Sequence, residues 1–308
     1  MLDRRVVWQV GTYSSVLGGF PMVKPVKTIG NPGSWLMQAF GDASHYAKDA
    51  AHEIHGDVIS HPKVKRIGIE DIRIALRKGA NDFLALRTDV LFIAILYPII
   101  GLSLSAIFFH RELLHLFFPL ISGFALLGPI AAVGLYEMSR RRENGETADF
   151  RAALGVMGSP AIGAVLIIGL GLVLMFIVWM LTAYLIFTLT LGPEPPISLT
   201  SFLWDVFTTG AGWAMLVIGC AVGSVFAAVT LAMTVVSIPL LLHRHVGVRV
   251  AIETSLELTR KNPVTVAIWG LIIAACLIVA MIPLFLGLIL AFPILGHATW
   301  HLYRRAVE

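Results

Sequence analysis

Charged residues are scarce in this sequence of 308 residues: Asp, Glu, Lys and Arg make up only 14% of it. A typical soluble domain contains about 25% of these residues, so the scarcity of charge excludes an ordinary soluble protein. Apolar residues make up 57% of the chain and gather in long runs. Each run reaches the roughly 20 residues that a helix needs to cross a bilayer core, which predicts an integral membrane protein.

Cysteine is also scarce, with only Cys220 and Cys276, and both lie inside apolar runs. The sequence contains no CxxC motif, which excludes a disulfide framework and a cysteine metal site. We interpret both cysteines as small apolar residues of a helix bundle.

Charges are absent from the middle of the apolar runs, because Glu137, Glu194 and Asp205 all lie near the ends of runs. Ion-coupled transport depends on ionisable residues inside the membrane. The pattern therefore argues against a proton pump or a cation antiporter. It leaves open a carrier for lipids or other amphiphiles.

Six apolar segments follow one another at about 88–109, 113–137, 160–190, 210–242, 263–281 and 284–303. The loops between these segments alternate between the two sides of the membrane. Of the 23 Lys and Arg residues, 22 lie on one side, and Arg111 is the exception. A bias of this kind marks the cytoplasmic side, so both termini are expected in the cytoplasm. Topology accounts for the net charge of +4, and we expect no nucleic-acid partner.

Residues 1–66 differ in composition from the rest and predict a cytoplasmic, partly disordered extension with one short helix near 34–58. Residues 67–308 then form the membrane domain. The motif AHEIH contains His52 and His55 but is one residue shorter than the zinc-binding motif H-E-x-x-H. We favour a solvated helix face there and predict no metal site.

Two segments end in similar ways: GPIAAVGLYEMSRR at 128–141 and FPILGHATWHLYRR at 292–305. An aromatic residue followed by paired arginines is typical of the interfacial end of a membrane helix. This alignment places Glu137 opposite His301. We predict that Glu137, His297 and His301 make polar contacts between helices, with His297 neutral and bonded to a neighbouring helix, and His301 close enough to water to reach it.

Short amphipathic stretches precede the odd-numbered segments: IEDIRIALRKGAND, ADFRAALGVMGSP and VAIETSLELTRKNP. They predict three related hairpins, each preceded by an interfacial helix. In the last stretch, Arg260 and Lys261 are candidate contacts for lipid phosphates. Glycines in 163–171, and small residues in 219–227, indicate close packing of helices.

The chain resembles an uncharacterised family of bacterial integral membrane proteins, some of which are labelled cytochrome c oxidase subunit I-like. The resemblance covers about 66–305 and includes GPIAAVGLYEMSRR, VVSIPLLLHRHV, SLELTRKNP and LGHATWHLYRR. It implies a multi-pass protein of the bacterial inner membrane and supplies no catalytic residue. A haem-copper oxidase needs several histidines near the middle of the membrane. Only His297 lies clearly inside a segment, so we expect no haem or other cofactor.

The sequence therefore predicts an all-α bundle of six transmembrane helices that is not an enzyme. We favour a scaffold, assembly or accessory protein whose partners are membrane lipids and another membrane protein or a respiratory complex. One alternative is a carrier or permease-like protein for a lipid or other amphiphile. A second alternative is an accessory subunit of a respiratory oxidase. A polar-lined cavity would favour the carrier, and a tightly packed interior would favour the scaffold.

Overall fold

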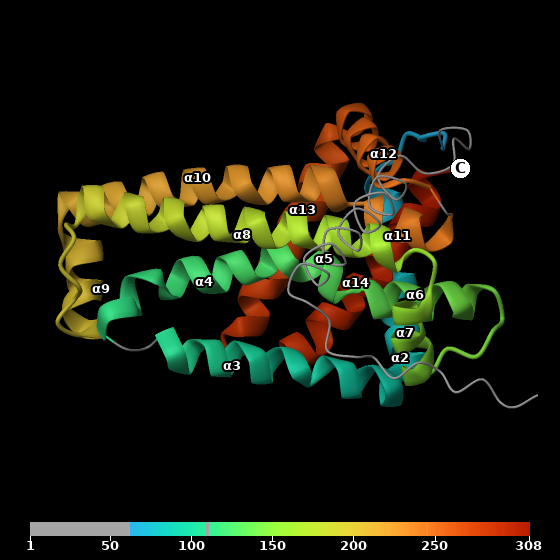
Figure 1. Ribbon diagram of the computed structural model, residues 1–308, viewed down its shortest axis with the longest axis horizontal. Helices are drawn as coiled ribbons and strands as arrows, with labels where there is room; N and C mark the ends of the chain where they lie inside the picture. Colours follow the sequence, from blue (N-terminus) through green and yellow to red (C-terminus); the bar gives the residue numbers. More distant parts are fainter. Residues whose placement is uncertain (1–61, 109–110, 245) are drawn as a thin grey trace, which may run out of the picture. The chain divides into compact units, whose positions relative to one another are not determined.

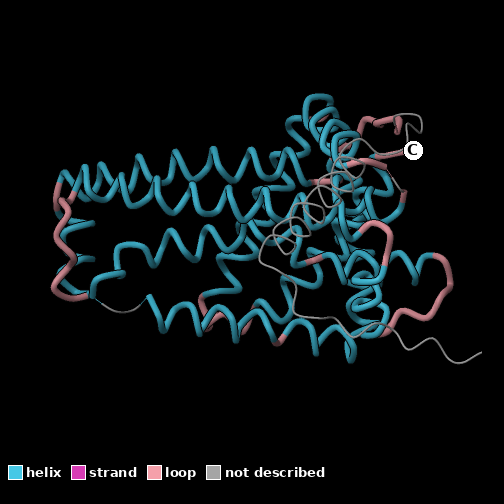
Figure 2. Tube along the Cα trace, in the orientation of Figure 1, coloured by secondary structure: helices cyan, strands magenta, loops and turns pink. Residues whose placement is uncertain are grey.

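The computed structural model describes residues 62–108, 111–244 and 246–308, all of which belong to one compact unit that starts at Tyr46. The predicted helix near 34–58, together with His52 and His55, lies outside these residues. Helices make up nearly all of the described chain, and loops gather at its two ends (Figure 2). The described residues form no strand, and their only extended pairing is an isolated antiparallel bridge between Val64 and Val307. The prediction of an all-α protein is thus confirmed for this part of the chain.

Within the described residues, five helices are long and apolar enough to cross a membrane: Thr88–Ile107, Leu113–Glu143, Ile162–Thr190, Gly210–His243 and Pro263–Met281. They coincide with the first five predicted segments. The sixth predicted segment is not among them, for a reason given below.

The longest helices, α8 (Ile162–Thr190) and α10 (Gly210–Thr234), run side by side (Figure 1). At one end of this pair lies α9 (Leu199–Thr208), and we call this the α9 end. The opposite end, which we call the basic end, holds the C-terminus and these helices: α6 (Val133–Glu143), α7 (Phe150–Gly155), α11 (Ser237–His243) and α12 (Val248–Lys261).

Three of the spans are interrupted rather than straight. The fourth is divided between α10 and α11 by a turn at residues 235–236. The first is divided between α2 (Ile69–Ala94) and α3 (Leu96–Phe108), where Pro98 lacks the N–H that would bond to the carbonyl of Ala94. The second passes through short helical pieces before α6: η1 (Arg111–Leu116), α4 (Phe117–Phe124), η2 (Ala125–Leu127) and α5 (Gly128–Ala131). A further turn, η3 (Val156–Gly158), precedes α8.

The last helix, α14 (Leu288–Ala306), begins later than predicted and is covered by protein. A turn separates it from α13 (Pro263–Met281), with left-handed φ angles of 53° at Leu284 and 64° at Phe285. Nearly every residue from Leu295 to Tyr303 is buried. The prediction of a sixth lipid-covered span is not confirmed, because polar side chains divide the apolar run and face neighbouring helices.

Helix α14 runs antiparallel along α2. Gly79 lies against the backbone of Ala298, and Arg305 pairs with Asp71 at 2.5 Å. Residues 297–306 of α14 therefore lie beside residues 71–82 of α2. Residues 71–82 of α2 precede the first candidate span, which begins at Thr88, and α14 is not itself among the candidate spans.

Helix α12 has the polar stripe that the sequence predicts: Arg249, Glu253, Glu257 and Arg260 are exposed. The predicted apolar face of Ile252, Leu256 and Thr259 is only half-buried. The buried positions are displaced by about one residue and are Val248, Ala251, Thr254, Ser255 and Leu258.

The segment just before α2 is attached to the C-terminal part of the chain. The backbone N–H of Lys65 donates to the Ala306 carbonyl at 2.8 Å, and that of Ile67 donates to Asn262 Oδ1 at 2.9 Å. Thr265 donates to the Ile67 carbonyl at 2.9 Å. Residues 62–66, which the sequence analysis assigned to the N-terminal extension, therefore pack with the helical unit.

Candidate functional site

A cavity of about 480 Å³ lies among the apolar helices. Four parts of the chain line it: residues 122–136, residues 224–235 of α10, residues 267–277 of α13 and residues 292–299 of α14. At 1.5 Å per residue, the stretches of α10 and α13 each extend about 15–17 Å. Ligand pockets of proteins commonly enclose about 300–1,000 Å³, so the volume suits an organic molecule.

Small side chains leave this space open. On α10, Ser224, Ala227 and Ala228 line the cavity, and Gly270 and Ala274 do so on α13. The sequence analysis interpreted small residues of α10 as contacts with another helix. This interpretation fits Gly223, where a Cβ atom would lie 2.9 Å from Trp179 of α8, but it does not fit the residues that line the cavity.

The mouth of the cavity faces outward between α10 and α13. Its lining residues Ala227, Ala228 and Ala274 are exposed, and so is Leu271. In contrast, Leu126, Ala132 and Leu295 on the opposite wall are buried. Because α10 and α13 are both candidate spans, a molecule that enters here comes from the lipid phase.

Hydroxyl groups concentrate in the half of the cavity nearer the basic end. They belong to Tyr136, Thr230, Thr234 and Thr299, all of which are buried. Thr234 donates to the Thr230 carbonyl at 2.6 Å, and Thr299 donates to the Leu295 carbonyl at 2.8 Å. The buried Thr230 hydroxyl has no hydrogen-bond partner among the described residues. A buried polar group of this kind normally has a partner, so a ligand in the cavity would satisfy it.

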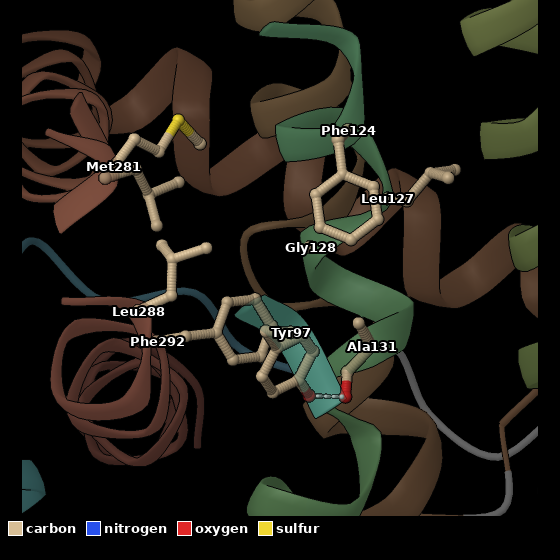
Figure 3. A pocket seen from close by; sticks show the side chains of 9 residues that line it. Tyr97, Phe124, Leu127, Gly128, Ala131, Met281, Leu288 and Phe292 are labelled. Carbon is tan, nitrogen blue, oxygen red and sulfur yellow. Dashed lines mark hydrogen bonds between the residues drawn. The ribbon is translucent and has the colours of Figure 1, made fainter. Parts of the chain in front are cut away.

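A second, smaller cavity of about 40 Å³ adjoins the first toward the α9 end. Figure 3 shows its apolar side chains, among them Phe124, Met281, Leu288 and Phe292. The Tyr97 hydroxyl beside it donates to the Ala131 carbonyl at 2.9 Å. Gly128, Leu277 and Phe292 line both cavities, so the two cavities are direct neighbours.

A buried polar network lies next to the cavity: its His297 lies between Gly296 and Thr299, which line the cavity, and its other members lie toward the basic end. The Ser139 hydroxyl donates to Asp82 Oδ2 at 2.6 Å and lies 2.7 Å from His297 Nδ1. His301 Nε2 lies 2.8 Å from the same carboxylate oxygen, and Arg142 pairs with the other oxygen. This network joins α2, α6 and α14. The Nε2 atom of His297 is buried without a hydrogen-bond partner among the described residues, so the network is satisfied only in part. Its hydrogen bonds and ion pairs to Asp82 still hold the three helices in a fixed arrangement.

Two groups of the network have shifted pKa values. Burial acts to raise the pKa of Asp82, but hydrogen bonds from His301 and Ser139 outweigh it and hold the pKa below its usual value. Burial lowers the pKa of His297 to about 4, even though the Asp82 carboxylate opposes this effect. Asp82 is therefore ionised and His297 neutral at neutral pH.

The neutral His297 predicts a loss of stability in mild acid. Unfolded histidine titrates near 6.5 and the folded residue near 4, so only the unfolded state takes up the proton in this range. The free energy of unfolding should therefore fall by about 3 kcal/mol between pH 6.5 and pH 4 from this residue. Unfolding titrations in detergent at several pH values would measure it. The His297→Gln variant serves as the control, and an equal pH dependence in that variant would contradict the prediction.

The predicted site residues have different surroundings. His297 lies against a hydroxyl of another helix. His301, which we expected to reach water, is buried against Asp82. The hydrogen bonds described for Glu137 run to Arg140 and Arg141 of its own helix, not to another helix. The arginines expected among lipid headgroups form ion pairs instead: Arg140 and Arg141 with Glu137, Arg304 with Glu143 and Arg305 with Asp71.

The candidate phosphate contacts lie at the end of α12. Arg260 is exposed, whereas the Lys261 ammonium donates to the Val64 carbonyl at 2.6 Å. Their binding to lipid phosphate stays a prediction.

Asp82, Ser139 and Thr230 were not predicted from the sequence. The first two lie in motifs recognised in the sequence, but their pairing joins residues 57 positions apart. Thr230 has no sequence signal, because threonine is common in membrane helices and its lack of a partner shows only in three dimensions.

Residues 117–243 match the model of a family described as "Predicted integral membrane protein (DUF2189)". The match covers the second, third and fourth candidate spans. The resemblance to an uncharacterised family of membrane proteins is thus confirmed for this part of the chain. The family description does not mention an oxidase. No curated protein and no solved structure matches the chain.

Proposed function

We propose that this integral membrane protein binds an amphiphilic lipid in the cavity among α4–α6, α10, α13 and α14, as a carrier or permease-like protein. The observation that carries the proposal is the cavity of about 480 Å³, which opens between two apolar helices and contains an unsatisfied buried hydroxyl. A mostly apolar lining with a few polar groups is typical of ligand sites. The binding needs no catalytic residue and no cofactor.

The cavity is mostly apolar and not polar-lined as we expected of a carrier, but its presence still shifts the balance between the alternatives. A scaffold that acts only through its outer surface has no use for an interior space, and cavities lower stability. Exposed apolar residues on α8 and α10, such as Leu170, Leu181 and Val217, also fit ordinary contact with lipid tails. We therefore favour the carrier over the scaffold and the oxidase accessory subunit.

The bias of Lys and Arg supports a location in which the basic end faces the cytoplasm. In this arrangement the hydroxyl groups of the cavity lie toward the cytoplasmic leaflet and the smaller apolar cavity toward the opposite leaflet. The resemblance to bacterial proteins supports the inner membrane as the membrane concerned.

A tryptophan at the mouth of the cavity tests the proposal. Ala274 is exposed and lines the cavity, whereas the neighbouring Ala275 is exposed without lining it. We expect Ala274→Trp to reduce the amount of co-purified lipid about tenfold, equivalent to about 1.4 kcal/mol of binding free energy. Mass spectrometry of lipids extracted from protein purified in mild detergent measures this amount.

The Ala275→Trp variant adds the same side chain one residue away and should retain the wild-type amount of lipid. Equal retention by the two variants would show that the cavity is not the binding site. Fluorescence-detected gel filtration would confirm that both variants are folded.

A further inference from the structure

We infer that the lipid bound in the cavity has an uncharged, hydrogen-bonding head, such as a hydroxyl, ester or carbonyl group, which bonds to Thr230. This inference rests on the proposed function and names the chemical class of its ligand. It depends on three features of the cavity: the unsatisfied Thr230 hydroxyl, the absence of charge from the lining, and the separation of its polar and apolar ends.

The Thr230 hydroxyl is the group to which the head of the lipid would bond. Thr230 lines the cavity and is only 4% exposed, and its buried hydroxyl has no hydrogen-bond partner among the described residues. In most threonines of the described helices the hydroxyl donates to a carbonyl one turn earlier, as it does in Thr234 and Thr299. Thr230 does not, so its hydroxyl is free to donate to a ligand or to accept from one.

The residues that line the cavity exclude a lipid with a charged head beside Thr230. None of the residues that line the cavity is Asp, Glu, Lys, Arg or His. A charge placed there would lose its hydration without gaining a counter-ion, which is strongly unfavourable in an apolar environment. The nearest charged groups in the network, Asp82 and Arg142, already pair with each other. A phosphate head would therefore have to stay outside and could not reach Thr230.

The apolar part of the ligand extends away from Thr230. Along α13 the lining continues from Gly270 to Leu277, and from there the smaller apolar cavity reaches Met281. Figure 3 shows Phe124, Leu288 and Phe292 around this end. A chain with its head at Thr230 would lie along the cavity with its tail toward the α9 end.

The test compares two probes with the same oleoyl chain, neutral 1-monooleoylglycerol and anionic 1-oleoyl-lysophosphatidylglycerol, titrated into delipidated full-length protein and measured by native mass spectrometry. We expect the neutral probe to bind about tenfold or more tightly than the anionic probe, because burial of a charge is unfavourable. In Thr230→Val, which keeps the shape of the side chain, the affinity for the neutral probe should fall about 3- to 10-fold. Thr182→Val is the matched control, because Thr182 is half-buried on α8 and does not line the cavity.

A second measurement separates binding from folding. Removal of an unsatisfied buried hydroxyl should leave the thermal midpoint of the empty Thr230→Val protein unchanged or higher. Equal affinities for the two probes, tighter binding of the anionic probe, or unchanged binding by Thr230→Val would each overturn the inference and leave the proposed function intact. If neither probe binds and Ala274→Trp retains as much lipid as Ala275→Trp, the proposed function itself fails.

Discussion

The Asp82→Ala variant should lose about 3 kcal/mol or more of unfolding free energy, because removal of one partner from a buried ionic network leaves the others uncompensated. Asp82 is 4% exposed and is bonded to Ser139, His301 and Arg142 on two other helices. The Arg142 side chain is 40% exposed and can turn toward water, which keeps the expected loss near the lower end of the range for buried pairs. SDS titration in mixed micelles, followed by tryptophan fluorescence, measures the change.

The control substitution is Glu70→Ala on the same helix. Glu70 pairs with Arg73 at 3.2 Å, and both side chains are largely exposed. An exposed pair at this spacing contributes only about 0.5 kcal/mol or less. Losses of similar size in the two variants would show that the network around Asp82 does not hold α2, α6 and α14 together.

Much of the membrane architecture could be predicted from the sequence, because lipid imposes a length and a composition on each spanning helix. The first five apolar runs coincide with the five candidate spans for this reason. The sixth run, at 284–303, failed this test. Its second half, from Leu295 to Tyr303, is buried by protein, and its histidines pair with other helices. A hydropathy pattern does not distinguish a protein neighbour from a lipid neighbour.

The candidate site could not be predicted, because it depends on distances between segments. The sequence analysis recognised small residues on α10 and assumed that another helix fills the space beside them. Ala227 and Ala228 instead line a cavity. The partners of the two histidines could not be predicted either. Ser139 is 158 positions away from His297 in the sequence, and Asp82 is 219 positions away from His301.

A close approach between α2 and α14 predicts the other large effect. Gly79 of α2 faces α14, where an added Cβ atom would lie 2.5 Å from the Ala298 nitrogen and 2.7 Å from the Ile294 carbonyl oxygen. These are backbone atoms and cannot rotate away, so Gly79→Ala must push α2 and α14 apart. We expect this variant to lose about 3 kcal/mol or more of unfolding free energy, at or above the upper end of overpacking costs. The same SDS titration measures the change.

Gly171 of α8 provides the matched control, because an added Cβ atom at this position would meet nothing within 4 Å. In a helix, alanine is favoured over glycine by about 0.5–1 kcal/mol, so Gly171→Ala should stabilise the protein by this amount. The same substitution of glycine by alanine is thus expected to lower the unfolding free energy at position 79 and to raise it at position 171. If Gly79→Ala also stabilised the protein, α2 and α14 would have to lie farther apart than the structure shows, and the network that joins Asp82 to His301 would be disrupted with them.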